Sequence, residues 1–316
     1  LERLLALATL CYGLPAPEGY AALEPLFKKH SIDLLLPPAA ALAASWAPLD
    51  RFLSIPAAAT ENGLPPMQPD FFGERFALTT LTARLTNPAH RQAFLAAALE
   101  ANPFGTLEFL ALAARDFPDD PVVELGTTAA LDRAQALGAD KTLAIVWSFG
   151  LFRLAVAFAV AQRPSRAETV YQTLLTLRPD HADTLNNYAT LLSKQPAHWA
   201  RAAELYERAL TLRPDHAATL YNYANLLSNQ PAQWARAAEL YERALTLRPD
   251  HADPLNNYAT LLSQQPAQRA RAAELYERAL TLRPDDADTL NNYATLLSQQ
   301  PAQWARAAEL YERALT

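Results

Sequence analysis

The chain has 316 residues, of which 51% are hydrophobic, and a formal net charge of −6. Without an excess of basic residues, nucleic-acid binding lacks its usual electrostatic driving force, and the single cysteine, Cys11, excludes a disulfide framework within the chain. The 8 Gly and 24 Pro residues are typical of short helices with defined ends, so we expect an almost entirely helical protein.

The first 85 residues predict a winged-helix-like domain. A short strand at residues 52–55, hairpin-turn residues at 61–63 and an N-cap at Asp70 follow three short segments with helical spacing of apolar residues. The third of these helices offers one cation, Arg51, and no polar face that could read bases, so we favour a regulatory or packing role over DNA binding. The three helical segments are residues 1–11, 18–30 and 38–53.

Residues 86–147 predict a helical connector. Helix breaks are expected at Asn87-Pro88, at Asn102-Pro103 and between Pro118 and Pro121. Asp119 and Asp120 can cap the helix that follows the third break.

The segment from Leu143 to Ala161 is apolar enough to resemble a membrane span. Arg153 lies at its centre, where insertion into a bilayer costs about 2.5 to 3.5 kcal/mol. We therefore expect a soluble fold in which Gly150 divides the segment into two buried helices, with no membrane partner.

A long stretch that begins at Arg201, RAAELYERALTLRPDHAATLYNYANLLSNQPAQWA, is repeated along the rest of the chain. Nearly the same sequence starts again at Arg236, Arg271 and Arg306, each 35 residues after the previous start. A more divergent copy starts at Arg166. A fixed period of this size predicts stacked supersecondary units.

Each unit contains two predicted helices. In residues 182–216, helix A (ADTLNNYATLLSKQ) and helix B (HWARAAELYERALTLR) are separated by Pro196, and Pro214 ends the second. Both helices carry apolar residues at i, i+3, i+4 and i+7, which predicts one buried stripe per helix. The stripe residues are Leu185, Tyr188, Ala189 and Leu192 in helix A, and Ala202, Leu205, Tyr206, Ala209 and Leu210 in helix B.

This alternation of large and small residues resembles the tetratricopeptide repeat. Two details depart from the family pattern: Tyr188-Ala189 replaces a commoner Leu-Gly pair, and the turn QPAHWAR holds one extra residue. The resemblance implies an all-α fold with a right-handed solenoid over residues 148–316. Its units start at residues 148, 182, 217, 252 and 287, and because the last one stops before its closing residues, we expect the chain to be part of a longer protein.

In tetratricopeptide proteins the A helices line a concave groove, which the resemblance implies is the ligand surface. Carboxamides offer both a donor and an acceptor, so a row of them can hold the backbone of an extended peptide. The same side chains can instead bond to neighbouring repeats, and the sequence leaves both possibilities open. The row occupies two positions beside each helix-A stripe and consists of Asn186, Asn187, Tyr221, Asn222, Asn256, Asn257, Asn291 and Asn292.

Further candidate ligand residues surround this row. Tyr221 is the one unit-specific change beside this row of asparagines, so we expect a local specificity position there. Arg153 holds the equivalent position of the first unit, where it either clamps a carboxylate or pairs with a nearby acid. One turn further along the same face lie Thr190, Asn225, Thr260 and Thr295.

The other periodic residues favour structural roles. Repeat stacking separates His181, His216 and His251 too widely for a shared metal ion. Trp residues at the start of helix B are expected to be half exposed and to pack, and Glu204 and Glu207 to pair with nearby Arg residues on the surface. With no phosphate-binding loop, HExxH or nucleophile-elbow motif in the sequence, we expect no enzyme activity, and no metal or cofactor, in this chain.

The order of domains resembles the C-terminal half of bacterial STAND-class signalling ATPases, and the segment QPDFFGE at residues 68–74 is similar to one that follows their winged helix. This resemblance implies a sensor that binds a protein or peptide, with ATP bound only in an upstream domain and with oligomerisation of the full-length protein. From the single cysteine we expect a reducing, cytoplasmic setting. Two alternatives remain: the substrate-presenting arm of an enzyme whose catalytic domain lies outside this chain, as in O-GlcNAc transferase, or a structural spacer.

Overall fold

The computed structural model describes residues 78, 82, 87–101, 103–137 and 141–315. Apart from Leu78 and Thr82, the predicted winged-helix domain lies outside these residues, with its strand, Cys11 and the QPDFFGE segment. In the described ranges every element is an α-helix or a short 3-10 helix, which confirms the all-α fold class there. The chain divides into two compact units, Leu1–Pro179 and Asp180–Thr316.

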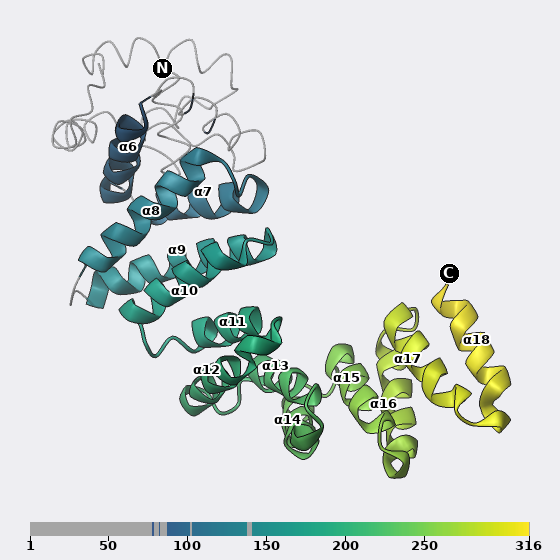
Figure 1. Cartoon of the computed structure of the whole chain (residues 1–316). Coiled ribbons are helices and arrows are strands. Elements are labelled where there is room, and N and C mark those ends of the chain that lie inside the picture. The colour runs from purple at the N-terminus through teal and green to yellow at the C-terminus, as the bar shows by residue number, and fades with distance from the viewer. Residues whose placement is uncertain (1–77, 79–81, 83–86, 102, 138–140, 316) are drawn as a thin grey trace, which may run out of the picture. The chain divides into compact units, whose positions relative to one another are not determined.

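Prolines start four described helices of the first unit, whereas a fifth starts at Lys141. Three of them begin at the predicted breaks, at Pro88, Pro103 and Pro121. The side chain of Asn87 accepts a hydrogen bond from the Ala89 N–H at 2.9 Å, and Asp120 caps the third helix by accepting from the Val122 N–H at 2.8 Å. The described helices of this unit are α6 (Pro88–Ala101), α7 (Pro103–Asp116), α8 (Pro121–Ala136), α9 (Lys141–Val160) and α10 (Pro164–Leu177) (Figure 1).

The α9 helix corrects one expectation. It runs unbroken from Lys141 to Val160, so the prediction that Gly150 divides it is wrong, and the expected domain boundary at residues 147 and 148 falls inside it. Gly150 is a contact residue: a Cβ there would lie 2.5 Å from the Cβ of Leu107 on α7. Glycine therefore lets α7 and α9 approach closely, and this packing offsets its low helix propensity.

The buried face of α9 follows the predicted stripe. Its side chains at Leu151, Leu154, Ala155 and Phe158 are completely buried, and the helix packs against α7 and α10. In the described part of the chain, α9 is the helix long and apolar enough to cross a membrane, over Leu143–Val160, but half of that window is buried inside the protein. Such burial is typical of a core helix.

The second unit is a succession of helix pairs (Figure 1). A 3-10 helix joins the members of each pair and contains the turn that carries the extra residue, as at Pro196–His198. This repeated helix-turn-helix packing confirms the tetratricopeptide-type solenoid. The A helices are α11 (Ala182–Ser193), α13 (Ala217–Ser228), α15 (Ala252–Ser263) and α17 (Ala287–Ser298); the B helices are α12 (Trp199–Leu212), α14 (Trp234–Leu247), α16 (Arg269–Leu282) and α18 (Trp304–Ala314).

The predicted stripes form the core of this unit. Leu185, Ala189, Ala202 and Leu205 have no exposed surface, and Tyr206 keeps 1%. Tyrosines of helix B also stack on the next helix A, with ring centroids 5.5 Å apart in the pairs Tyr206–Tyr223, Tyr241–Tyr258 and Tyr276–Tyr293.

The periodic histidines precede the A helices. Their Nδ1 atoms lie 2.6 Å from the Thr184 hydroxyl for His181 and 2.7 Å from the Thr219 hydroxyl for His216. Asp286 at the equivalent position instead accepts a hydrogen bond from the Thr289 backbone N–H at 2.8 Å. Within the described residues, no three His, Cys, Asp or Glu side chains are grouped so that they could hold a metal ion.

The tryptophans that start helix B bind the end of helix A. The indole N–H of Trp199 donates to the carbonyl of Ser193 at 2.9 Å, which gives a partner to a terminal helix carbonyl. Trp234 and Trp304 do the same for Ser228 and Ser298. The third pair has Arg269 at this position, and its Nε atom is buried without a hydrogen bond.

The helix contact at Gly150 can be tested with a matched pair of glycines. We expect Gly150→Ala to lower the free energy of unfolding by about 1 to 3 kcal/mol, because the new Cβ meets the rigid Cβ of Leu107. Gly126→Ala meets the flexible Cδ2 atom of Leu110 at the same 2.5 Å, so Leu110 can move and the cost is smaller. Urea unfolding measures both; an equal loss would contradict the assignment of Gly150 as a contact residue.

The indole contact predicts opposite effects of exchanging Trp and Arg. Arg269→Trp should raise the free energy of unfolding by about 0.5 to 1.5 kcal/mol, since it supplies the missing N–H donor for the end of α15. Trp234→Arg should lower it by a similar amount. Denaturant melts of the two variants give the comparison, and a change of the same sign in both would refute the role of the indole.

Candidate functional site

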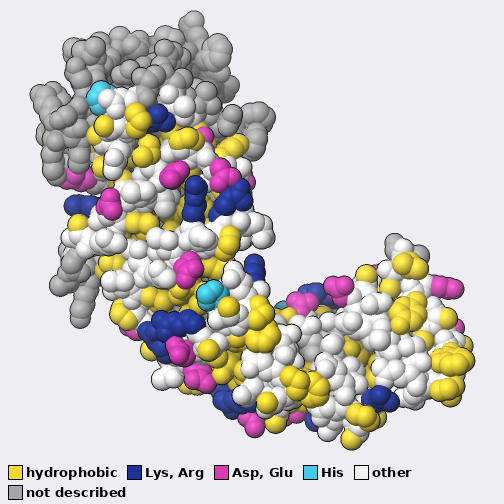
Figure 2. Space-filling model, viewed as in Figure 1, with side chains coloured by type: hydrophobic (Ala, Val, Ile, Leu, Met, Phe, Trp, Pro, Cys, Tyr) yellow, Lys and Arg dark blue, Asp and Glu magenta, His cyan; other side chains and the backbone are white. Residues whose placement is uncertain are grey.

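The carboxamide row lies on the A helices of the second unit. Asn187, Asn222, Asn257 and Asn292 are all half-buried, whereas Asn186 beside the first is buried, with 6% of its surface exposed. This partial burial follows from the helical period, because the positions of these asparagines adjoin the buried stripe of each A helix. On the side of the molecule seen in Figure 2, acidic and basic side chains are mixed over the described residues.

Most of the row takes part in bonds between adjacent repeats. The Asn222 Nδ2 donates to Asn186 Oδ1 at 3.2 Å, and Asn292 Nδ2 donates to Asn256 Oδ1 at the same distance. Because α13 thereby bonds to α11 and α17 to α15, the row joins neighbouring A helices. The structural interpretation of the asparagines therefore has direct support.

Tyr221 replaces an asparagine in this network. Asn257 Nδ2 donates to the Tyr221 hydroxyl at 2.9 Å and to Asn225 Oδ1 at 3.1 Å. The Tyr221 ring also lies 6.2 Å from the ring of His251 and 6.4 Å from that of Tyr241. The unit-specific tyrosine, which we predicted as a specificity position, thus has a packing role as well.

Some hydrogen-bonding groups of the row remain unused. Within their own helices, Asn186 donates to Asn187 Oδ1 at 2.9 Å and Asn256 donates to Asn257 Oδ1 at 3.1 Å. Among the described residues, no partner contacts Asn187 Nδ2, Asn222 Oδ1 or Asn292 Oδ1. The exposed side chain of Asn291 is likewise without a hydrogen bond in this part of the chain. These groups are the ones that a ligand can reach.

The next positions on the same face bond to tyrosines of helix B. Tyr241 donates to Asn225 Oδ1 at 2.5 Å. The threonines Thr190, Thr260 and Thr295 contact the hydroxyls of Tyr206, Tyr276 and Tyr311 at 2.9, 2.9 and 3.1 Å. This set of predicted ligand residues therefore also fixes each helix A to its helix B.

Arg153 lies on α9 in the first unit, whereas the carboxamide row belongs to the second. Its Nη2 atom forms an ion pair with Glu108 of α7, a carboxylate that is 8% exposed. Of the two predicted roles, pairing with a nearby acid is present in the structure. The Arg153 side chain still exposes 53% of its surface.

One network was missed by the sequence analysis. Glu207 does not pair with an Arg in its own helix; it accepts a hydrogen bond from the hydroxyl of Tyr223 in the next repeat at 2.9 Å. Tyr258 and Tyr293 donate in the same way to Glu242 and Glu277, which also pair with Arg271 and Arg306. The surface-pair prediction is confirmed for Glu204, which lies 2.7 Å from Arg201. The sequence signal that could have revealed this network is the constant spacing of 16 residues between each Glu and its Tyr.

Comparison with known proteins gives a fold likeness. No protein-family model matches the chain, and no curated protein matches it significantly. The crystal structure of MamA shares 15% identity at a TM-score of 0.45, covering 51% of this chain and 92% of that one. The 41-end fragment of MamA from Desulfovibrio magneticus RS-1 has 16% identity, a TM-score of 0.47, and coverage of 56% and 94%. YrrB, described as a TPR protein with an unusual peptide-binding site, has 16% identity, a TM-score of 0.43, and coverage of 53% and 84%.

The buried tyrosines predict a loss of stability at alkaline pH. Burial raises the pKa of Tyr206 from 10.0 to about 12, and burial, followed by the hydrogen bond to Glu207, raises the pKa of Tyr223 to about 12. The unfolded chain loses these protons near pH 10 while the folded chain keeps them. The free energy of unfolding that these two tyrosines contribute is therefore fully present below pH 10, and it is lost as the pH rises to about 12.

Urea unfolding across this pH range measures the effect. In Tyr223→Phe the decline between pH 10 and 12 should be shallower, since one raised pKa is removed. A wild-type stability that does not change over this range would contradict the burial of the phenol groups.

Proposed function

We propose that the helix pairs of residues 182–315 form a non-catalytic module that binds a peptide or protein segment across the A helices. The carrying observation is the half-buried carboxamide row with groups left over after the repeats are joined: Asn187 Nδ2, Asn222 Oδ1 and Asn292 Oδ1. Spare donors and acceptors in a row suit the alternating N–H and C=O groups of an extended backbone.

The pattern of side chains favours a ligand that is held by its backbone. The row itself is uncharged, so it supplies polar partners without selecting a charged sequence. Tyr221 is half-buried, has ring contacts with Tyr241 and His251, and is the one position of the row that is not an asparagine. Selectivity for a ligand side chain is therefore expected near α13.

A finer proposal takes the chain as one part of a longer protein. The module would act as the cytoplasmic sensor of a bacterial signalling ATPase, with ATP bound in an upstream domain and with oligomerisation of the whole protein as the output. The order of the predicted domains supports this assignment. A Walker A motif upstream would support it further, whereas a transferase domain downstream would favour the substrate-presenting alternative.

The binding proposal is tested with displayed random peptides selected on the wild-type chain. The strongest peptide is then titrated by calorimetry against the wild type and against Asn187→Ala combined with Asn222→Ala and Asn292→Ala. We expect affinity to fall by about tenfold or more, because each lost hydrogen bond contributes about 0.5 to 1.5 kcal/mol. Tyr221→Asn should alter which peptides are selected.

A control separates binding from stability. The triple variant also removes two bonds between repeats, Asn222 to Asn186 and Asn292 to Asn256, so its helicity and melting curve are recorded. Arg201→Ala with Arg236→Ala removes exposed ion pairs elsewhere in the unit and should leave the affinity unchanged. Equal affinity of the folded triple variant and the wild type would exclude the row as a peptide site.

A further inference from the structure

Among the described residues of the first unit, the α9 helix carries exposed apolar side chains along one line. Val146, Phe149 and Val160 expose 37%, 56% and 63% of their surfaces. Together with Arg153 and half-buried Val156 they form a line, called here the α9 seam, spaced by 3, 4, 3 and 4 residues. This spacing is the one by which a helix presents a continuous seam to a second helix.

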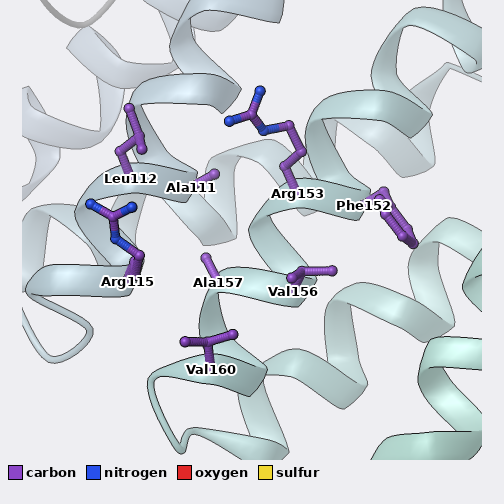
Figure 3. Close-up of a pocket in the computed structure, with 8 residues that line it drawn as sticks. All are labelled: Ala111, Leu112, Arg115, Phe152, Arg153, Val156, Ala157 and Val160. Carbon is purple, nitrogen blue, oxygen red and sulfur yellow. The ribbon is translucent and has the colours of Figure 1, made fainter. Parts of the chain in front are cut away.

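A hollow lies beside the C-terminal half of the α9 seam. Figure 3 shows Ala111, Leu112 and Arg115 of α7 on one side and Arg153, Val156, Ala157 and Val160 of α9 on the other. Its volume is about 210 Å³, which is below the range of roughly 300 to 1,000 Å³ typical of small-molecule sites. The buried alanines, Ala111 and Ala157, leave this space, and a single large side chain fits it better than a cofactor.

The centre of the α9 seam is a half-exposed guanidinium, that of Arg153, which is already ion-paired with Glu108 on its buried side. Arg153 uses its Nη2 atom for Glu108, and its side chain remains 53% exposed. Arg115, half exposed and bonded to Asp116, provides a second cation on the other side of the hollow. A planar guanidinium set among apolar residues selects a carboxylate that approaches along the same line.

We infer that the α9 seam binds an amphipathic helix of a partner protein. The partner helix carries apolar residues at 3-4 spacing and an Asp or Glu opposite Arg153, and one of its large apolar side chains enters the hollow between α7 and α9. A polar pair at the centre of an otherwise apolar seam fixes the register of two helices. This site differs from the carboxamide row in its residues, in its compact unit and in its ligand chemistry, although Arg153 holds in α9 the position that the row's asparagines hold in the later repeats.

The opposite face of α9 argues against a lipid partner. Leu151, Leu154, Ala155 and Phe158 are completely buried, and α9 packs on α7 and α10, so lipid cannot surround this helix. Two properties of the α9 seam, the knob-and-hole spacing and the central cation, are features of helix pairing. We therefore treat vesicle binding as an outcome of the test.

The test uses the whole chain and a displayed library of amphipathic peptides. The peptides are about 20 residues long, enough for a marginal helix, with apolar residues varied at 3-4 spacing and the central seam position fully randomised. We expect selected peptides to have Asp or Glu at that position. Their affinity should fall about tenfold or more in Phe149→Ser and in Arg153→Gln, and should fall less in Arg153→Lys, which keeps the charge but not the planar pair of donors.

Control variants test whether the loss of affinity is specific to the α9 seam and whether the chain stays folded. Leu247→Ser removes a side chain that is 43% exposed on α14, outside the α9 seam, and should leave the affinity unchanged. Ala157→Leu fills the hollow and should weaken binding while the melting curve shows an intact fold. Because Arg153→Gln leaves Glu108 without its cation, Arg153→Lys supplies the folded comparison.

Three results would overturn the proposal. One is a selection that returns no binder, or only peptides whose affinity survives both Phe149→Ser and Arg153→Gln. Another is self-association in sedimentation that Phe149→Ser abolishes, which would assign the α9 seam to a second copy of the chain. The last is binding to anionic or zwitterionic vesicles that depends on Phe149, which would assign it to a membrane surface.

Discussion

Burial of the Leu, Tyr and Ala stripes between successive helices is the interaction on which the second unit depends. A single helix pair has no other apolar surface to bury, so each pair is stabilised by the pairs beside it. The polar contacts follow from this packing. Once Tyr206 and Leu205 are inside, the Tyr hydroxyls, the Thr and Asn side chains and the indole N–H groups fall into the same positions in every repeat and bond to the same neighbours.

The carboxamide row shows how stability and binding share side chains. Asn222 and Asn292 use their amide nitrogens to hold adjacent A helices together, while their oxygens remain available. A ligand bonded to those oxygens would be connected, through one asparagine, to two neighbouring A helices. Binding would therefore stiffen the stack, because the ligand adds to bonds that already cross from repeat to repeat.

The sequence predicted the features that depend on local chemistry. Helix starts at Pro88, Pro103 and Pro121, the cap at Asp120 and the buried stripes all follow from residue type and spacing. Contacts between distant residues could not be predicted in this way. The interruption expected at Gly150 is absent because Leu107, on another helix, occupies the space that a side chain would need.

Repetition itself limited the prediction of the site. Near-identical repeats duplicate every residue, so the recurrence of Asn could not separate a ligand group from a bond between repeats. The bonds of Asn186, Asn222 and Tyr221 in the structure are what show which side-chain groups join the repeats and which remain available to a ligand. Likewise, the Tyr223 hydroxyl reaches Glu207 because helix B packs on the next helix A, a fact that no spacing within one helix contains.

The uniform 35-residue step has a consequence for the length of the protein. Removal of residues 217–251 would place His216 directly before Ala252, which is the neighbour of the equivalent His251. The new junction would reproduce an existing interface. Duplication or loss of whole repeats therefore lengthens or shortens the surface of the A helices without creating a new kind of interface between repeats. The length of that surface can change by one repeat at a time while the packing of each helix pair stays the same.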